Sequence, residues 1–184
     1  SKSLKKNDPN HLNLGIRYGY IEQLDDELLR ISKESFDALS FNCYALSPDH
    51  EKMNHALEIS GLPMIIGEYH FGTVDRGLAQ SLWQVNSQKE RGDAFRYYTE
   101  NAFAHRGLIG TGWFRWIDQN INGRTDGENY NCGFIDVTDR PYPYMVDAAI
   151  ETAKSLYEIH SGTKTPFHQA PNAVGHSPIP DLWE

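Results

Sequence analysis

The chain has 184 residues, enough for one domain with a sizeable core. It carries 17 Lys and Arg against 25 Asp and Glu, a formal net charge of −8, and its basic residues are scattered. Such a surface repels nucleic acid, so we expect no nucleic-acid partner. The longest aliphatic runs, such as residues 64–66, are far too short for a transmembrane helix, so we expect no membrane partner.

The cysteines and histidines show no metal-binding pattern. Cys43 and Cys132 have no CxxC or zinc-ligand spacing, and we expect two free or buried thiols. The histidines form no HxH or HxxxH pair beside a carboxylate cluster, so we expect no metal and no cofactor. Residues 1–6 are basic but no apolar segment follows them, so the sequence shows no signal peptide.

Hydrophobic periodicity predicts four strands that alternate with four helices. The expected strands are residues 11–17, 38–44, 63–70 and 108–114. The expected helices are residues 24–35, 51–60, 88–103 and 144–160. Residues 161–184 are rich in Pro, His, Asn and Ser without periodicity, and we expect an irregular C-terminal tail or surface strap.

A strand followed by a helix, four times over, predicts an α/β fold with a parallel sheet. Each expected strand ends in polar or aromatic residues, which is where a (β/α)8 barrel carries its active site. A doubly wound sheet is the alternative, but no GxGxxG follows the first strand and no GxxxxGK[ST] occurs. Because a barrel needs eight strands and roughly 250 residues, we expect residues 1–160 to form half of one.

Glu68 is the strongest catalytic candidate, because it ends the most apolar strand, a run that we expect to be buried on both faces. A structural Glu bonded to an Arg or a backbone amide is the alternative. Asn42 and Tyr44 lie two residues apart and share one face of their strand, where the Tyr hydroxyl can orient a carboxylate. His70 would point to the same side as Glu68, although its position alone favours a hydrogen-bonded histidine at the rim.

Aromatic and polar residues follow the last predicted strand. Trp113 and Trp116 suit stacking on the faces of pyranose rings, and packing in the core or at the rim is the alternative. A polar loop continues through Asp118, Arg124 and Glu128, whose planar groups suit sugar hydroxyls, although most charged loops are merely solvated. No GxSxG nucleophile elbow is present.

Several segments, in this order, resemble the C-terminal half of the catalytic barrel in β-agarases of glycoside hydrolase family 50. The resemblance runs from about residue 7 to residue 160 and rests on DPNHLNLG (8–15), SFNCY (40–44), PMIIGEYHFG (63–72), DRG (75–77), WF (113–114) and GRTDGENYNCGF (123–134). It implies that the four expected strands are the fifth to eighth of a retaining (β/α)8 glycosidase.

The resemblance also implies roles for the candidate residues. Glu68 would be the nucleophile of a double displacement that hydrolyses β-linked, galactose-containing polysaccharide. Tyr44 would steady that carboxylate, and Trp113 would lie beneath the sugar at the cleaved bond. The residues expected by position to contact substrate are Arg17, Asn42, His70, Trp116, Asp118 and Glu128.

One departure from the family pattern limits what the chain is expected to do. Retaining hydrolysis needs a second carboxyl group about 5–5.5 Å from the nucleophile. In the family it is the Glu of an Asn-Glu pair that ends the fourth strand, and Glu128-Asn129 has the reverse order. We therefore expect the isolated chain to be inactive. The missing N-terminal barrel half would come from the same polypeptide, a separate chain or a second copy.

Two other functions remain open. One is another retaining glycosidase of the same clan, of the β-galactosidase or β-glucanase type. The other is a non-catalytic carbohydrate-binding remnant. The resemblance favours an extracellular or periplasmic location, because polysaccharide hydrolases of this kind usually act outside the cytoplasm.

Overall fold

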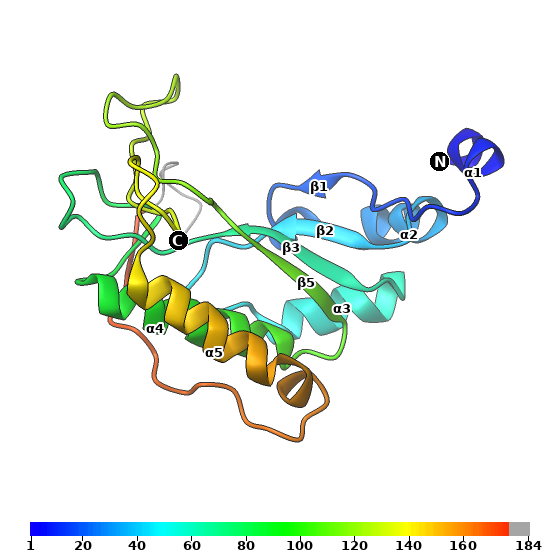
Figure 1. Cartoon of the computed structure of the whole chain (residues 1–184). Coiled ribbons are helices and arrows are strands. Elements are labelled where there is room, and N and C mark those ends of the chain that lie inside the picture. The colour runs from blue at the N-terminus through cyan, green and yellow to red at the C-terminus, as the bar shows by residue number, and fades with distance from the viewer. Residues whose placement is uncertain (177–184) are drawn as a thin grey trace.

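A computed structural model describes residues 1–176, and the end of the predicted tail, 177–184, lies outside the described residues (Figure 1). Four parallel strands form a sheet in the order β1-β2-β3-β5. They are β1 (Arg17–Tyr18), β2 (Leu39–Asn42), β3 (Met64–Tyr69) and β5 (Leu108–Trp113). The main helices are α2 (Asp26–Ser35), α3 (His50–Ser60), α4 (Gln88–Phe103) and α5 (Pro143–His160). The predicted α/β fold, with its order of strands and helices and its parallel sheet, is confirmed.

Four shorter elements complete the fold. They are α1 (Lys2–Asn7), the 3-10 helix η1 (Ile21–Gln23), β4 (Trp83–Gln84) and β6 (Val174–Gly175). Strands β4 and β6 pair antiparallel as a separate two-stranded sheet. Strand β6 lies within the segment where the lack of periodicity predicted irregular structure.

The first strand is much shorter than the predicted residues 11–17. Gly15 has a φ of 72°, in the left-handed region, and a strand cannot continue through it. The preceding Asn13 bonds to Asp37 instead, since its backbone N–H donates to the Asp37 carboxylate and its carbonyl accepts from the Asp37 N–H. Residues 11–16 therefore stay outside the sheet, and the first strand, β1, consists of residues 17–18 alone.

Helix starts follow capping side chains. The Asp25 side chain accepts a hydrogen bond from the backbone N–H of Leu28, so α2 starts two residues later than predicted. The Asp49 side chain caps the start of α3 in the same way. Gly61 ends α3 in a left-handed conformation, with a φ of 65°, and the helix therefore stops at residue 60, where the predicted helix 51–60 ends.

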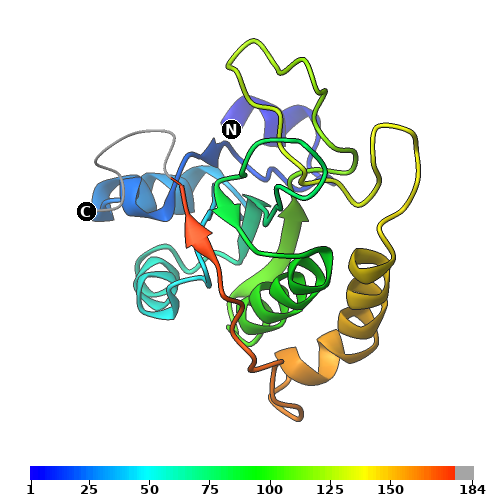
Figure 2. The same ribbon diagram turned by 90° about the vertical axis from the view of Figure 1, so that its left-hand side faces the viewer.

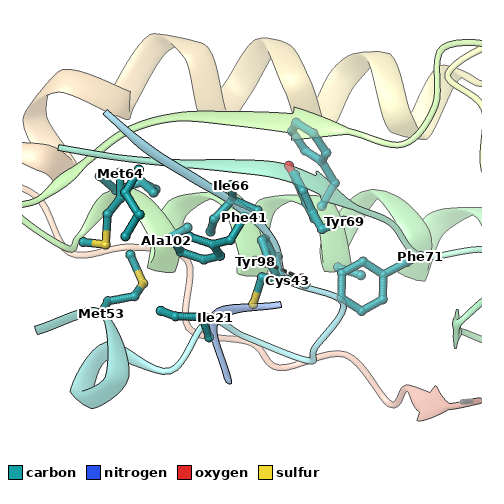
Figure 3. Packing of buried hydrophobic residues seen from close by; sticks show 14 of the residues in the cluster. Ile21, Phe41, Cys43, Met53, Met64, Ile66, Tyr69, Phe71, Tyr98 and Ala102 are labelled. Carbon is teal, nitrogen blue, oxygen red and sulfur yellow. Dashed lines mark hydrogen bonds between the residues drawn. The ribbon is translucent and has the colours of Figure 1, made fainter. Parts of the chain in front are cut away.

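The hydrophobic core lies between the sheet and the helices. Figure 2 shows α3, α4 and α5 in an arc along one side of the sheet, and Figure 3 shows Phe41 and Ile66 packed near Tyr98 of α4. Along β2 and the first half of β3, buried residues alternate with half-buried ones, whereas residues 67 and 68 are both half-buried. The prediction that the third strand is buried on both faces is wrong, because among the described residues no helix covers its second face, where Ile65 stays half-buried.

The loops that follow β3 and β5 are joined by a buried polar cluster centred on Asn131. Its side-chain oxygen accepts hydrogen bonds from Thr73 and from Gln88, at 2.9 and 2.7 Å. Its amide nitrogen donates to the carboxylate of Asp118, and its backbone carbonyl accepts from the guanidinium of Arg91. Both loops are thereby held in one arrangement.

Both cysteines are buried and unpaired, as predicted. Burial raises the pKa of Cys43 to about 11 and that of Cys132 to about 12, so both thiols stay protonated at neutral pH. Within the part of the chain that the structure describes, no helix combines the length and apolar character needed to cross a bilayer.

Two glycines of β5 allow a matched test of how closely it packs against β3. A Cβ on Gly112 would lie 2.6 Å from the backbone oxygen of Gly67, whereas a Cβ on Gly110 would lie 3.7 Å from the Ile65 side chain. We expect Gly112→Ala to lower the free energy of unfolding by about 1–3 kcal/mol, since the backbone must shift. Gly110→Ala is the control and should change it little. Equal losses in urea unfolding would contradict the packing of these two strands.

Candidate functional site

Polar side chains meet at the C-terminal edge of the sheet because the strands run parallel. Asn42 and Glu68 are direct partners in the pairing of β2 with β3, and Tyr69 is paired with Trp113 of β5. Arg17 begins β1 on the other side of β2, where it pairs with Ser40. The strands thus bring Arg17, Asn42 and Glu68 to one place.

Glu68 accepts bonds from three side chains that belong to two other segments of the chain. The Tyr44 hydroxyl donates to Oε2 at 2.8 Å, and the Asn42 amide nitrogen donates to the same oxygen at 3.2 Å. The Arg17 guanidinium lies 2.8 Å from Oε1. The carboxylate side chain is 19% exposed, so it is held firmly yet remains accessible. The structure brings all four of these predicted site residues together.

Gly67 makes the Arg17 contact sterically feasible. A Cβ on Gly67 would overlap the Cδ atom of Arg17, so the Arg17 stem crosses the sheet directly over this residue. Because glycine has no side chain, the guanidinium from β1 reaches a carboxylate on β3, two strands away.

Tyr44 can act only as a hydrogen-bond donor to Glu68. Burial, followed by the negative charge of Glu68, raises the pKa of Tyr44 far above its ordinary value. The phenol therefore keeps its proton, and its hydroxyl stabilises the carboxylate charge without competing as a base.

A cavity of about 240 Å³ opens onto Glu68. It contains a second carboxylate, Glu128, from the long loop after β5. The residues that line the cavity are Tyr20, Tyr44, Glu68, His70, Leu82, Phe114, Arg124 and Glu128. Their mixture of one aromatic wall and several planar polar groups suits a ligand that presents both hydroxyl groups and an apolar face.

Glu128 is held in the cavity by two donors. The Gln119 amide nitrogen donates to Oε2 at 2.7 Å, and the Arg124 guanidinium lies 3.4 Å from the same atom. Arg124 also pairs with Asp126 at 2.7 Å, and its guanidinium carbon lies 5.8 Å from the centre of the Phe114 ring. The loop therefore presents a cation and an anion beside an aromatic ring.

His70 lines the cavity, but both of its ring nitrogens are already used. Nδ1 is 3.0 Å from the Phe114 carbonyl oxygen, and Nε2 accepts the Leu82 N–H at 3.1 Å. Burial lowers the pKa of His70 to about 3, so the ring is neutral, and Nδ1 carries the proton that it donates to Phe114. His70 thus fits the hydrogen-bonded histidine that the sequence left open as an alternative, and both of its ring nitrogens are already bonded within the chain.

Three other predicted substrate contacts lie outside this cavity. The Trp113 indole donates to the Cys132 carbonyl at 2.7 Å and packs in the aromatic core beneath the site. Trp116 is 68% exposed, with one face stacked on Phe134. Asp118 is 4% exposed and serves the buried cluster around Asn131, where bonds within the chain satisfy its carboxylate.

Sequence reasoning missed three of the residues that line the cavity. Phe114, rather than Trp113, presents the aromatic ring of the last strand to the cavity, because side chains alternate between the two faces. Tyr20 lies two residues after the end of β1, and the rule that a site forms at the C-terminal ends of parallel strands could have identified it. Leu82 comes from an irregular loop, and no pattern in the sequence marks it.

A metal site in the described part of the chain would need a cluster of side chains that could bind the ion. Among residues 1–176, no group of three or more His, Cys, Asp or Glu side chains is arranged to hold a metal ion. The cavity itself presents two carboxylates, one guanidinium group, two phenols and a neutral imidazole.

The neutral state of His70 makes stability depend on pH. The unfolded histidine titrates near pH 6.5 and the folded one near 3, so between these values the unfolded chain binds the extra proton. The free energy of unfolding should therefore fall as pH drops below about 6.5, by at most about 1.4 kcal/mol per pH unit from this residue. In His70→Gln this component should be lost, whereas the exposed control His168→Gln should keep it. Identical pH profiles for all three proteins in urea unfolding would contradict the assignment.

The chain was compared with protein families and with known proteins. A comparison with protein-family models gives no match. The chain is 37% identical over 162 residues to β-agarase A and 35% identical over 161 residues to β-agarase B, both of Vibrio sp. (strain JT0107). Each match covers 84% of this chain, and the chain spans only 16% of the length of each relative.

The chain is also similar to solved structures of agarases. An agarase, AgWH50C, superposes with a TM-score of 0.80 and 38% identity, covering 86% of this chain and 25% of that one. An exo-β-agarase also gives a TM-score of 0.80, with 35% identity over 89% of this chain and 22% of its own. The resemblance predicted from the sequence is confirmed: over most of its length, the chain is related to a segment of the family 50 agarases.

Proposed function

We propose that this chain is the nucleophile-bearing half of a retaining glycoside hydrolase that cleaves β-linked, galactose-containing polysaccharide. The observation that carries the proposal is the Glu68 carboxylate, held by Arg17, Asn42 and Tyr44 at the floor of an open cavity. The names of the agarase relatives support the substrate class.

We further propose that the chain forms strands five to eight of a (β/α)8 barrel. In residues 1–176, β1 and β5 are the two edges of the sheet, and helices cover only one of its faces. A four-stranded partner pairing with both edges would close the barrel and enclose the second face. Ile16, 58% exposed beside β1, and Ile109, 55% exposed on β5, mark the apolar surfaces that such a partner would cover.

In this mechanism, Glu68 attacks the anomeric carbon and the bond to the leaving sugar oxygen breaks. A carboxylic acid of the missing half protonates that oxygen and then, as a base, takes a proton from the water that hydrolyses the glycosyl ester. Arg17 and Tyr44 stabilise the negative charge that Glu68 carries before attack and regains on release. Tyr44 keeps its own proton throughout.

Glu128 is assigned to substrate binding rather than to proton donation. Its neighbours Gln119 and Arg124 both donate to it, so it is arranged as an acceptor for sugar hydroxyls. Phe114 supplies the ring on which the apolar face of a sugar can stack.

The nucleophile can be tested in a polypeptide that includes the upstream barrel half. We expect Glu68→Gln to lower kcat at least about 10³-fold, because the attacking group is lost. Azide should restore turnover in Glu68→Ala by forming a glycosyl azide, a product that identifies the nucleophile. The exposed control Glu58→Gln on α3 should keep full activity. Unchanged kcat in Glu68→Gln would exclude the proposed mechanism.

The isolated chain should hydrolyse no neoagaro-oligosaccharide, since it lacks the proton donor. Product analysis would measure this, with light scattering showing whether the 21.0 kDa chain is a monomer. Hydrolysis that disappears in Glu68→Gln would show that the chain is sufficient and would overturn this expectation. Sugar binding without turnover that survives Glu68→Ala in the longer polypeptide would instead favour a carbohydrate-binding protein.

A further inference from the structure

Residues 163–176, here called the C-terminal strap, connect the end of α5 to the loop beside the Glu68 cavity. Figure 2 shows this segment leaving α5, passing below α4 and ending at β6 next to β4. The strap contains no helix and only the two-residue strand β6. Its course is therefore set by contacts with the rest of the chain.

Phe167 is the first anchor of the strap. Its backbone N–H donates to the Glu100 carboxylate at 2.8 Å, and its carbonyl accepts from the Asn101 amide at 3.1 Å. Glu100 is only 1% exposed, and the guanidinium carbon of Arg96 lies 4.6 Å from the centre of the Phe167 ring. Side chains of α4 thus satisfy both backbone groups of one strap residue.

The second anchor lies at the other end of the strap. Strand β6 pairs antiparallel with β4, and the His176 N–H donates to the Leu82 carbonyl at 2.7 Å. Gly175 lies against Trp83, since a Cβ there would be 3.1 Å from the indole ring. The strap therefore ends on the residue before β4, which is also a wall of the Glu68 cavity.

A continuous series of hydrogen bonds runs from this anchor into the cavity. The His176 N–H donates to the Leu82 carbonyl, the Leu82 N–H donates to His70 Nε2, and His70 Nδ1 donates to the Phe114 carbonyl. Leu82, His70 and Phe114 all line the cavity. The His70 ring also packs edge-on against Tyr44, with the ring centres 5.0 Å apart.

We propose that the C-terminal strap is a positioning element of the Glu68 cavity, acting through the bond from the His176 N–H to Leu82. Each member of the series fixes the next, so the strap sets the wall formed by Leu82, His70 and Phe114. Glu68 itself is held independently by Arg17, Asn42 and Tyr44. We therefore expect the strap to affect how tightly the cavity binds its ligand. The identity of that ligand, a galactose-containing sugar, rests on the proposed function.

The structural part of the proposal can be tested on the full chain without any activity. His176→Pro removes the donating N–H, whereas the matched control His176→Ala keeps it and removes only the ring. Hydrogen exchange should be about tenfold faster at the Leu82 amide in His176→Pro and within about twofold of the parent in His176→Ala. Exchange in α2 and α3 should not change in either variant.

Exchange at Leu82 that is the same in His176→Pro and the parent would overturn the proposal. If His176→Pro does not fold, the double variant Glu100→Ala/Asn101→Ala removes both backbone bonds of the first anchor instead, and the same rise at Leu82 is expected. No rise at Leu82 in that folded variant would equally overturn it.

A kinetic test separates positioning from simple loss of structure. In a polypeptide with the upstream barrel half, His176→Pro should raise KM several-fold with kcat within about twofold of the parent. A lower kcat at unchanged KM would indicate a smaller folded fraction and would contradict the positioning role. An inactive parent would count against the proposed function alone, because the exchange experiment still decides the role of the strap.

Discussion

Three side chains from two other segments of the chain bond to Glu68, and this convergence depends on the parallel direction of β1, β2 and β3. Parallel strands place all their carboxyl ends at one edge, so residues at or near those ends can meet without any special loop geometry. Arg17 and Asn42 reach Glu68 from β1 and β2. An antiparallel neighbour would place its own end at the opposite edge and leave the carboxylate without that donor.

The elements that follow periodicity could be predicted, and so could the site residues that end them. Asn42, Tyr44 and Glu68 stand within or just after strands whose alternation is plain in the sequence. The first strand was predicted too long, because one left-handed glycine outweighs an alternating pattern. Trp113 shows a further limit of prediction from the sequence. The sequence shows two adjacent aromatic residues, 113 and 114, but only the strand register decides which ring faces the cavity.

The loops lay beyond sequence reasoning for a different physical reason. Their arrangement depends on buried polar contacts between distant residues, such as those of Asn131 with Thr73 and Asp118. Hydrogen bonds of this kind leave no periodic trace, and a charged loop residue is normally solvated. Asp118 therefore reads as a surface acid in the sequence, although it supports the interior. The sequence predicted a tail or surface strap but not its anchors, since Glu100 satisfies the Phe167 backbone from an ordinary helical position.

Gly67 links the two sides of the site in a way that constrains how such sequences can diverge. Its missing side chain leaves room for Arg17 on one strand, while its backbone oxygen occupies the space that a side chain at Gly112 would need. Positions 17 and 67 should consequently vary together among related sequences, whereas position 112 should stay glycine whatever residue occupies position 67, because every residue carries that backbone oxygen. A homologue that retains Glu68 but carries a larger residue at position 67 would have to recruit a different cation, from another direction, for the same carboxylate.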